Sequence, residues 1–238
     1  MVNEYEYKYE YDNILDKIAH EKNCNNGKGK NKHGYTKWYH FHLKDFRHRK
    51  NNLLEIGVDQ GNSLYMWQEY FKNSTIYGID KNRKNIPDNV KKQFKVFIGD
   101  QKDKKFLNKV CRYVSSGFDV IIDDASHIPQ YQVRTFVHLF RHLKSGGIYA
   151  IEDLYSSYYP KFEEHKYPSF IDFCKNMIDD INFHGRFKWC NFDIIKKNIF
   201  TDIRKKGKRH LEPRSLNEYE EMISSIHFYN GLCFVYKR

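Results

Sequence analysis

The sequence predicts an α/β fold in which a mostly parallel sheet ends in an antiparallel hairpin. Short apolar runs, typical of buried parallel strands, alternate with segments of helical periodicity. This alternation indicates a parallel sheet with helices on both faces. Near the C-terminus, Asn230-Gly231 separates two strand-like segments, which is the strongest short-range signal for a hairpin. Five parallel strands and the two hairpin strands give an expected sheet of seven.

Residues 1–50 are expected to form an N-terminal helical extension or lid, and residues 51–238 the main domain. Within the extension, residues 21–34 are polar and contain glycine, so we expect a loop between two helices. The first helix is predicted from the helical spacing of Ile14, Leu15 and Ile18, and the second over residues 36–46.

The main domain is expected to begin with a buried strand that ends in a glycine-rich turn. The parallel strands are predicted at residues 53–58, 75–80, 94–100, 118–124 and 148–153, and the hairpin strands at 225–229 and 232–236. Helices are predicted over residues 63–71, 104–113 and 129–142, and around 168–181. Residues 144–147, which include two glycines, are expected to end the third of these helices.

Composition excludes several classes of protein. No stretch approaches the roughly 18 apolar residues of a membrane span, and the N-terminus lacks the features of a secretory signal. The five cysteines are widely spaced and form no CxxC pair, which argues for reduced thiols and against a zinc site or a disulfide framework. We therefore expect a cytoplasmic protein. The net charge of +11 is compatible with nucleic acid, a phosphate-bearing substrate or a solvated surface.

Acidic side chains and glycines stand at the carboxyl ends of all five predicted parallel strands. In open α/β sheets, ligands bind beyond these ends, near the point where the strand order reverses. A purely structural sheet has no need of acids at every strand end, so we expect the functional site here. These residues are Glu55 and Gly57, Asp80, Gly99 and Asp100, Asp123 and Asp124, and Glu152 and Asp153.

The turn after the first strand indicates a site for an adenosine ligand. Gly57 and Gly61 allow the backbone to approach a ligand closely, and the turn leads into a helix at Ser63. Asp80, at the end of the second strand, could accept both ribose hydroxyls. Asp59 stands where a dinucleotide-binding turn needs glycine, and its charge would repel a pyrophosphate. An adenosine ligand without phosphate fits better, although an ordinary strand–turn–helix connection remains an alternative.

A second group combines three carboxylates with a histidine. Asp124, Glu152 and Asp153 follow two strands that should be neighbours, and crowded carboxylates repel one another unless they bind a cation or take up protons. Oxygen ligands of this kind suit Mg²⁺. His127, three residues after Asp124, could act beside the metal as a general base. The alternative is a helix cap and a surface histidine.

Four segments together resemble the Mg²⁺-dependent, S-adenosylmethionine-dependent sugar O-methyltransferases of the macrocin/mycinamicin type. They lie at residues 55–58, 123–127 (DDASH), 152–160 (EDLYSSYYP) and 226–230. The loop at residues 29–36 is similar to a Lys-Gly…His-Gly-Tyr-Thr segment of that family. The resemblance runs from about residue 14 to the C-terminus and is weak over residues 161–222.

The resemblance implies a Rossmann-like class I methyltransferase fold, S-adenosylmethionine and Mg²⁺ as cofactors, and self-association into a homo-oligomer. It implies that Asp124, Glu152 and Asp153 bind the metal and that His127 is the catalytic base. The cofactor site would comprise Glu55, Gly57, Gly61, Asn62, Ser63, Asp80, Gly99, Asp100 and Asp123.

The acceptor is expected to be a sugar, a nucleotide-sugar or a glycan. Basic segments at residues 28–50 and 196–214 could attract a phosphorylated acceptor, or could simply be solvated. Tyr155, Tyr158 and Tyr159 could stack on a sugar ring, or could serve as core or oligomer contacts. Two alternatives stay open: a transferase for catechol-like aromatics, which would need an apolar acceptor pocket, and a methyltransferase-fold protein that binds or modifies RNA. The acids and His127 argue against nucleic acid, because RNA ribose methylation commonly uses a lysine-centred site.

Overall fold

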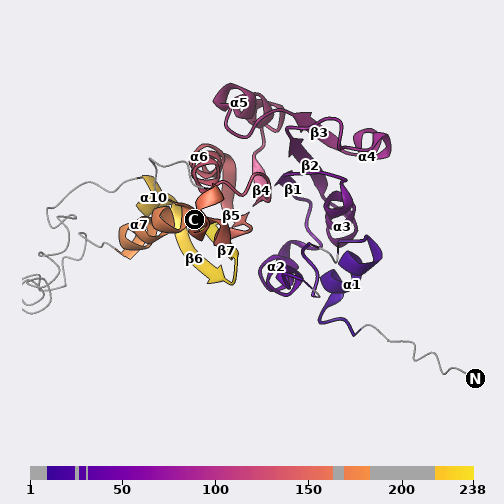
Figure 1. The fold of residues 1–238 in the computed structure, drawn as a ribbon, viewed down its shortest axis with the longest axis horizontal. Coiled ribbons are helices and arrows are strands. Elements are labelled where there is room, and N and C mark those ends of the chain that lie inside the picture. Colours follow the sequence, from indigo (N-terminus) through magenta and orange to yellow (C-terminus); the bar gives the residue numbers. More distant parts are fainter. Residues whose placement is uncertain (1–9, 25–26, 31, 163–168, 183–217) are drawn as a thin grey trace, which may run out of the picture.

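The computed structural model describes residues 10–24, 27–30, 32–162, 169–182 and 218–238 (Figure 1). A seven-stranded sheet in the order β3-β2-β1-β4-β5-β7-β6 forms its centre. Strands β1 to β5 pair in parallel, whereas β7 is antiparallel to both β5 and β6. The predicted sheet and hairpin are therefore confirmed. The strands are β1 (Asn52–Ile56), β2 (Thr75–Asp80), β3 (Lys95–Ile98), β4 (Phe118–Asp123), β5 (Leu143–Ile151), β6 (Ile223–Tyr229) and β7 (Leu232–Lys237).

The helices are α1 (Ile14–Glu21), α2 (Tyr35–Leu43), α3 (Asn62–Tyr70), α4 (Asp88–Gln93), α5 (Lys104–Tyr113), α6 (Pro129–Leu139), α7 (Phe170–Asn182) and α10 (Glu218–Met222). Short 3₁₀ turns are η1 (Lys44–Phe46), η2 (Phe140–His142), η3 (Leu154–Tyr158) and η4 (Pro160–Phe162). The sequence reading did not anticipate α4 or α10. Among the described residues, no helix is long and apolar enough to cross a membrane. The basic segment 196–214 lies outside the described residues.

Alternate residues of each strand bury opposite faces of the sheet. Leu53 of β1 faces a cluster that contains Leu64 and Trp67 of α3, whereas Leu54 faces a cluster that contains Val110 of α5 and Phe136 of α6. Figure 1 shows the corresponding arrangement, with α1, α2 and α3 on one side of the sheet and α5, α6 and α7 on the other. Because both faces are covered, the central strands read as continuous apolar runs in the sequence.

Strand β5 begins earlier than the sequence suggests. Residues 144–147 were expected to end a helix, but they lie within β5, which starts at Leu143 directly after η2. The register with β4 shifts here, since Phe118 pairs with Leu143 and Val120 with Ile148. Gly146 has a φ of +75° inside this irregularity. The glycines therefore allow a bulge in a strand, which a helix-ending signal resembles in sequence.

The N-terminal loop is anchored by a buried carboxylate. Asp16 of α1 is fully buried, and its Oδ1 accepts hydrogen bonds from Thr36 Oγ1 and from the amide of Lys30, each at 3.1 Å. Helix α1 begins at the cap Asn13, whose side chain accepts the amide protons of Leu15 and Asp16. These contacts fix the loop between α1 and α2, and with it the position of the residues that reach the site below.

Candidate active site

Strand β1 ends in a carboxylate that lies inside the protein. Glu55 is fully buried, and its Oε2 accepts a hydrogen bond from Ser63 Oγ at 2.6 Å. Its Oε1 accepts one from Trp67 Nε1 at 3.1 Å. Both donors belong to α3, so Glu55 fastens the start of that helix to the sheet. Burial raises the pKa of the Glu55 carboxyl.

Asp80 braces the glycine-rich turn. Its Oδ2 accepts the amide protons of Val58 and Asp59, each at 2.9 Å, and its Oδ1 accepts that of Asn82 at 2.6 Å. The turn needs this support because Asp59 adopts a positive φ of 45°. Asp80 thus stands at the end of β2 beside the turn, as the sequence predicts, and holds it in shape.

Gly57 brings the ends of β1 and β4 into contact. Its φ is +96°, and a Cβ at this position would collide with the carbonyl oxygen of Asp124. The amide of Asp124 donates to the carbonyl of Ile56 at 2.9 Å, which locks the two strand ends together. At Gly61, the φ is +79° and a Cβ would lie 2.6 Å from Val90 Cγ2. Both positions therefore require glycine.

Three further residues of the predicted cofactor site lie around the same turn. The exposed Asn62 begins α3, with its Nδ2 3.5 Å from the carbonyl oxygen of Asn23. The amide of Gly99 donates to the carbonyl of Asp80 at 3.0 Å. Asp100 forms an ion pair of 3.1 Å with Lys81. Partial burial raises the pKa of Asp100, but the Lys102 amide and the Lys81 ammonium outweigh it and hold the pKa below its ordinary value.

Asp123 lies behind the strand ends rather than among them. It is fully buried, with Oδ1 3.4 Å from Gln101 Nε2. The carboxyl also lies beside the buried hydroxyl of Tyr149. Burial, together with the charge of Asp124, raises the pKa of Asp123 to about 8. A protonated carboxyl at neutral pH avoids a second buried charge beside Asp124.

A buried lysine lies among three carboxylates at the centre of the site. Lys28 Nζ is 2.5 Å from Asp124 Oδ2, 2.6 Å from Glu152 Oε1 and 3.5 Å from Glu55 Oε1. Only 5 % of the lysine side chain is exposed. Because the ammonium touches both, Asp124 and Glu152 lie on the same side of the sheet, close enough to share one cation. Tyr39, from α2, also donates to Glu152 Oε1 at 2.6 Å.

Asp153 and His127 complete the arrangement. Donor atoms of Asp124, His127 and Asp153 all lie within 4.8 Å of one another. His127 Nδ1 is 3.3 Å from Asp153 Oδ2, but the two atoms do not form a hydrogen bond. The buried Nδ1 atom makes no hydrogen bond with any other described residue. Tyr35 holds Asp153 from the other side, since its hydroxyl donates to Asp153 Oδ1 at 2.9 Å. Both His127 and Asp153 have positive φ values, of 54° and 56°, a strain that is common at functional sites.

The donor set fits a hard divalent cation. When ionised, the carboxylates of Glu55, Asp124, Glu152 and Asp153 exceed the single ammonium of Lys28 by three negative charges. Burial and the charge of Asp124 raise the pKa of Glu152 to about 8 despite the contact with Lys28. The raised pKa shows that Lys28 does not compensate all of the negative charge of these carboxylates. A further cation would do so, and carboxylate oxygens are the ligands that Mg²⁺ prefers.

Sequence reasoning missed Lys28, Tyr35 and Tyr39 as parts of the site. They lie far from the strand ends in sequence, and the loop and α2 bring them back over the sheet. The one available signal was the resemblance over residues 29–36, which borders Lys28 and includes Tyr35. Gln132, on α6, was also missed; it donates to the backbone carbonyl of Glu152 at 2.9 Å.

The fold and the acidic strand ends define a protein of the class I methyltransferase fold. The structure of the MycE methyltransferase of the mycinamycin pathway, in complex with Mg and SAH, matches with a TM-score of 0.73 and 28% identity, and covers 94% of this chain and 54% of that one. A second MycE structure, which also contains mycinamycin VI, matches with a TM-score of 0.74. No family model matches the chain.

Curated relatives give the same assignment from sequence. Demethylmacrocin O-methyltransferase of Streptomyces fradiae is 33% identical over 86% of this chain, and a rhamnosyl tetracenomycin-C 2'-O-methyltransferase of Streptomyces olivaceus is 30% identical over 87%. Mycinamicin VI 2''-O-methyltransferase of Micromonospora griseorubida is 37% identical over 55% of the chain and 34% of its own length. The chain spans about half the length of the first two relatives. It belongs to the macrocin/mycinamicin family of sugar O-methyltransferases.

Proposed function

We propose that this protein transfers a methyl group from S-adenosylmethionine to a sugar hydroxyl of a glycosylated small molecule, with Mg²⁺ as the second cofactor. The observation that carries the proposal is the convergence of Asp124, His127 and Asp153 beside the Lys28–Glu152 pair. The names of the relatives support the acceptor class, because one is a 2'-O-methyltransferase of a rhamnosyl tetracenomycin and the other two are O-methyltransferases of mycinamicin VI and demethylmacrocin.

Asp124 and Asp153 would hold the metal, with Glu152 as the third ligand predicted from the sequence. A bound Mg²⁺ would acidify a coordinated sugar hydroxyl and orient it. Tyr35 fixes the Asp153 carboxylate, and Lys28 fixes those of Asp124 and Glu152. These contacts keep the ligands in place before the ion arrives, so that little reorganisation accompanies binding.

His127 would accept the proton of the attacking hydroxyl. Its Nδ1 faces Asp153, which leaves Nε2 as the nitrogen free to take the proton. The carboxylate of Asp153 would also stabilise the imidazolium that forms. His127 is close to one-third exposed, so the acceptor can reach it from solvent.

The cofactor site would be the turn after β1 and the ends of β2 and β3. The turn glycines, Asp80 and Asp100 lie there, and S-adenosylmethionine would bring a sulfonium methyl to the neighbouring acids. The carboxylates that surround Lys28 favour a cationic, phosphate-free adenosine ligand over a dinucleotide.

Exposed aromatic side chains border the metal ligands on the acceptor side. Tyr158 and Tyr159 are 70% and 52% exposed, and they follow Asp153 within and just after η3. His33 stacks on both Tyr35 and Tyr155, at ring-centroid distances of 5.1 and 6.4 Å. Polar rings of this kind can pack against a sugar and still contact water. A catechol-type acceptor would favour an apolar pocket instead.

The proposal is tested by methyl transfer with purified protein. S-adenosylmethionine is supplied with Mg²⁺ and, in separate reactions, a rhamnosyl glycoside, a nucleotide-sugar, a catechol and an RNA. We expect the glycoside to be methylated and EDTA to abolish the reaction until Mg²⁺ is restored. Methylation of catechol alone, or Mg²⁺-independent methylation of RNA, would replace the proposal by one of the two alternatives.

His127→Gln tests the role of the base separately. The amide cannot accept the proton, so we expect turnover to fall by about 10²–10⁴-fold. Binding of S-adenosylhomocysteine, measured by calorimetry, should stay close to that of the wild type. His48→Gln, at an exposed position, is the matched control and should retain turnover. Normal turnover of His127→Gln would remove this residue from the mechanism.

A further inference from the structure

A second cluster of metal-binding side chains lies far from the candidate active site. Donor atoms of Cys111, His138 and His142 all lie within 4.8 Å of one another. Cys111 comes from α5, His138 from α6 and His142 from η2. Cys111 is buried and His142 is exposed. The cluster has no part in the function proposed above.

The topology places this cluster at the opposite end of the sheet. Helices of an α/β fold run back toward the amino ends of the strands, and η2 leads directly into β5 at Leu143. Gly117, which precedes β4, lies against the carbonyl of His142. The acids of the candidate active site follow the carboxyl ends of the same two strands. With six residues at about 3.3 Å each, β4 separates the two sites by roughly 20 Å.

Local sequence explains why the three donors meet. His138 and His142 are four residues apart, a spacing that puts both rings on one face of a helix, and their centroids are 6.1 Å apart. Buried Leu139 and Phe140 fix this turn against the core. Cys111 lies on the buried face of α5, with Leu107 and Val110. Cys111 and the turn that carries both histidines are therefore held by packing, whether or not a ligand is present.

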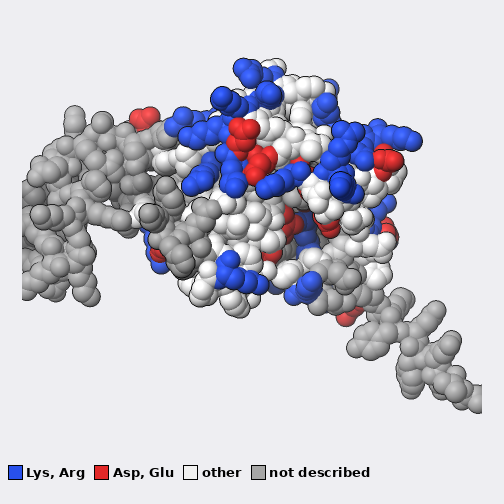
Figure 2. All heavy atoms as spheres, turned by 45° about the horizontal axis from the view of Figure 1, so that its top comes forward, with Lys and Arg blue, Asp and Glu red and all other residues white. Residues whose placement is uncertain are grey.

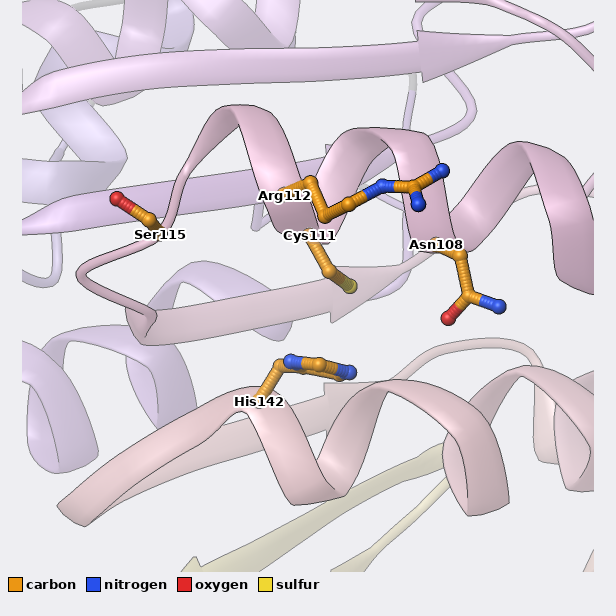
Figure 3. Close-up of a pocket in the computed structure, with 5 residues that line it drawn as sticks. All are labelled: Asn108, Cys111, Arg112, Ser115 and His142. Carbon is orange, nitrogen blue, oxygen red and sulfur yellow. The ribbon is translucent and has the colours of Figure 1, made fainter.

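Two observations suggest that the cluster has a ligand. His138 Nε2 is a buried polar atom without a hydrogen-bond partner among the described residues, which is costly unless something binds it. A hollow of about 350 Å³ adjoins the other two donors and is lined by Asn108, Cys111, Arg112, Ser115 and His142. Figure 3 shows the Cys111 sulfur directed across this hollow toward the ring of His142. The hollow gives an ion a path to the donors.

The chemistry of the surroundings selects the kind of ion. No carboxylate is among the lining residues, and the positive side chains of Arg112, Arg141 and Lys237 lie nearby. The charge of Lys104 also acts on His138. A hard cation such as Mg²⁺, which depends on oxygen ligands, is therefore excluded. A thiolate and two imidazoles suit a softer ion, because their bonds to it are partly covalent and because the thiolate offsets one positive charge.

We propose that Cys111, His138 and His142 bind Zn²⁺, which ties α5 to the end of α6. Tetrahedral bonds of about 2.3 Å to sulfur and 2.0–2.1 Å to nitrogen put the ligand atoms about 3.3–3.6 Å apart. The three ligand atoms lie within 4.8 Å of one another, and rotation of the exposed His142 side chain can bring them to these separations. A water from the hollow takes the fourth position. The spacing of the three residues matches no CxxC-type motif, so the sequence alone argued against zinc.

Cobalt spectroscopy of the full chain tests the site. Co²⁺ is titrated in the presence of saturating Mg²⁺, which occupies the hard site. We expect a sulfur-to-cobalt charge-transfer band, strong visible bands of a tetrahedral ion, and displacement of both by one equivalent of Zn²⁺. Cys111→Ala should abolish the charge-transfer band. His142→Gln should weaken Co²⁺ binding at least about tenfold.

Cys24→Ala is the matched control, because Cys24 is a buried cysteine close to Lys28 and Glu152 in the candidate active site. It should keep the charge-transfer band. Absence of the band from the wild type, its survival in Cys111→Ala, or its loss in Cys24→Ala would overturn the proposal. Circular dichroism checks the fold of each variant. If Cys111→Ala does not fold, the test rests on His142→Gln, because a substitution at this exposed position should leave the fold intact. Unchanged Co²⁺ affinity of His142→Gln would also overturn the proposal.

Discussion

Lys28 shows how a single residue can organise a site. Its ammonium touches Asp124 and Glu152 and lies 3.5 Å from Glu55, all in a buried place. Removing one partner of a buried ion pair leaves the others uncompensated, which costs about 3–5 kcal/mol. Lys28 therefore both stabilises the fold and limits how strongly the acids attract a second cation.

Lys28→Met separates these two effects. Without Mg²⁺, we expect the variant to unfold at a lower temperature, because the carboxylates of Glu55, Asp124 and Glu152 then repel one another without a compensating ammonium. Added Mg²⁺ should raise the melting temperature of the variant more than that of the wild type, since the site is then more negative. Thermal unfolding with and without Mg²⁺ measures both.

Lys30→Met provides the control on the same loop. Lys30 pairs with Asp12 at 2.8 Å, but both side chains are more than one-third exposed, so the pair contributes little. Its melting temperature and its response to Mg²⁺ should match the wild type. An equal response of Lys28→Met and wild type to Mg²⁺ would show that the ammonium does not act on the proposed metal site.

The raised pKa of Asp123 predicts that the stability of the folded protein falls as the pH rises. Its pKa is about 8 in the folded protein, against 3.8 as the ordinary value. Between these values the folded state keeps a proton that the unfolded chain has lost. Stability from this group is thus full below the ordinary pKa and falls by up to about 1.4 kcal/mol per pH unit as the pH rises toward the folded pKa.

Asp123→Asn isolates this contribution, because the amide resembles the protonated carboxyl and does not titrate. Urea unfolding without Mg²⁺, at pH values from about 5 to about 8.5, should show the variant gaining stability over the wild type as the pH rises. A difference that stays constant across this range would mean that Asp123 is already ionised in the folded protein.

At the scale of elements, the turn between β1 and α3 depends on one glycine. Gly57→Ala forces a Cβ into the backbone of Asp124 at a positive φ. We expect a loss of about 3 kcal/mol or more in the free energy of unfolding. Gly34→Ala is the matched control: its φ is +66°, but a Cβ there meets nothing within 4 Å. It should cost only about 1–2 kcal/mol.

Urea denaturation measures the loss for both glycine variants. Equal losses would mean that the left-handed backbone alone accounts for the effect at Gly57. In that case, the collision of the added Cβ with the backbone of Asp124 would contribute nothing to the loss of unfolding free energy.

At the scale of the whole molecule, α1 and α2 share a core with the main domain. Leu15 of α1 and Tyr39 of α2 are fully buried in the cluster that contains Trp67 of α3 and Phe234 of β7. The division at residue 50 stays a prediction. From these contacts we expect both parts to unfold together.

Leu15→Ala tests this coupling. The cavity should lower the free energy of unfolding by about 2–5 kcal/mol, in one transition seen alike by tryptophan fluorescence and circular dichroism. Phe41→Ala, on α2 and 58% exposed, should change it by less than about 0.5 kcal/mol. Two separate transitions would show that the extension folds on its own.

Surface charge bears on partners rather than on the fold. The chain carries a net charge of +11, and Figure 2 shows Lys and Arg side chains spread over much of the visible face, with acidic ones between them. The expected homo-oligomer and cytoplasmic location stay predictions.

The sequence by itself determined the sheet, its hairpin and the acids at its strand ends. Burial on both faces leaves apolar runs, and the Asn230-Gly231 turn is local, so both are readable from neighbouring residues. The bulge at Gly146 was misread, because a glycine that ends a helix and one that bends a strand look alike in sequence.

Only the tertiary structure decided which of the acidic side chains contact a cationic side chain, and that this side chain is Lys28. Asp123 and Asp124 are adjacent in sequence, yet Asp123 is fully buried at the end of β4, whereas Asp124, just after the strand, contacts Lys28. Lys28 and Glu152 are 124 positions apart. Such a contact depends on the packing of α1 and α2 over the sheet, which no local pattern encodes.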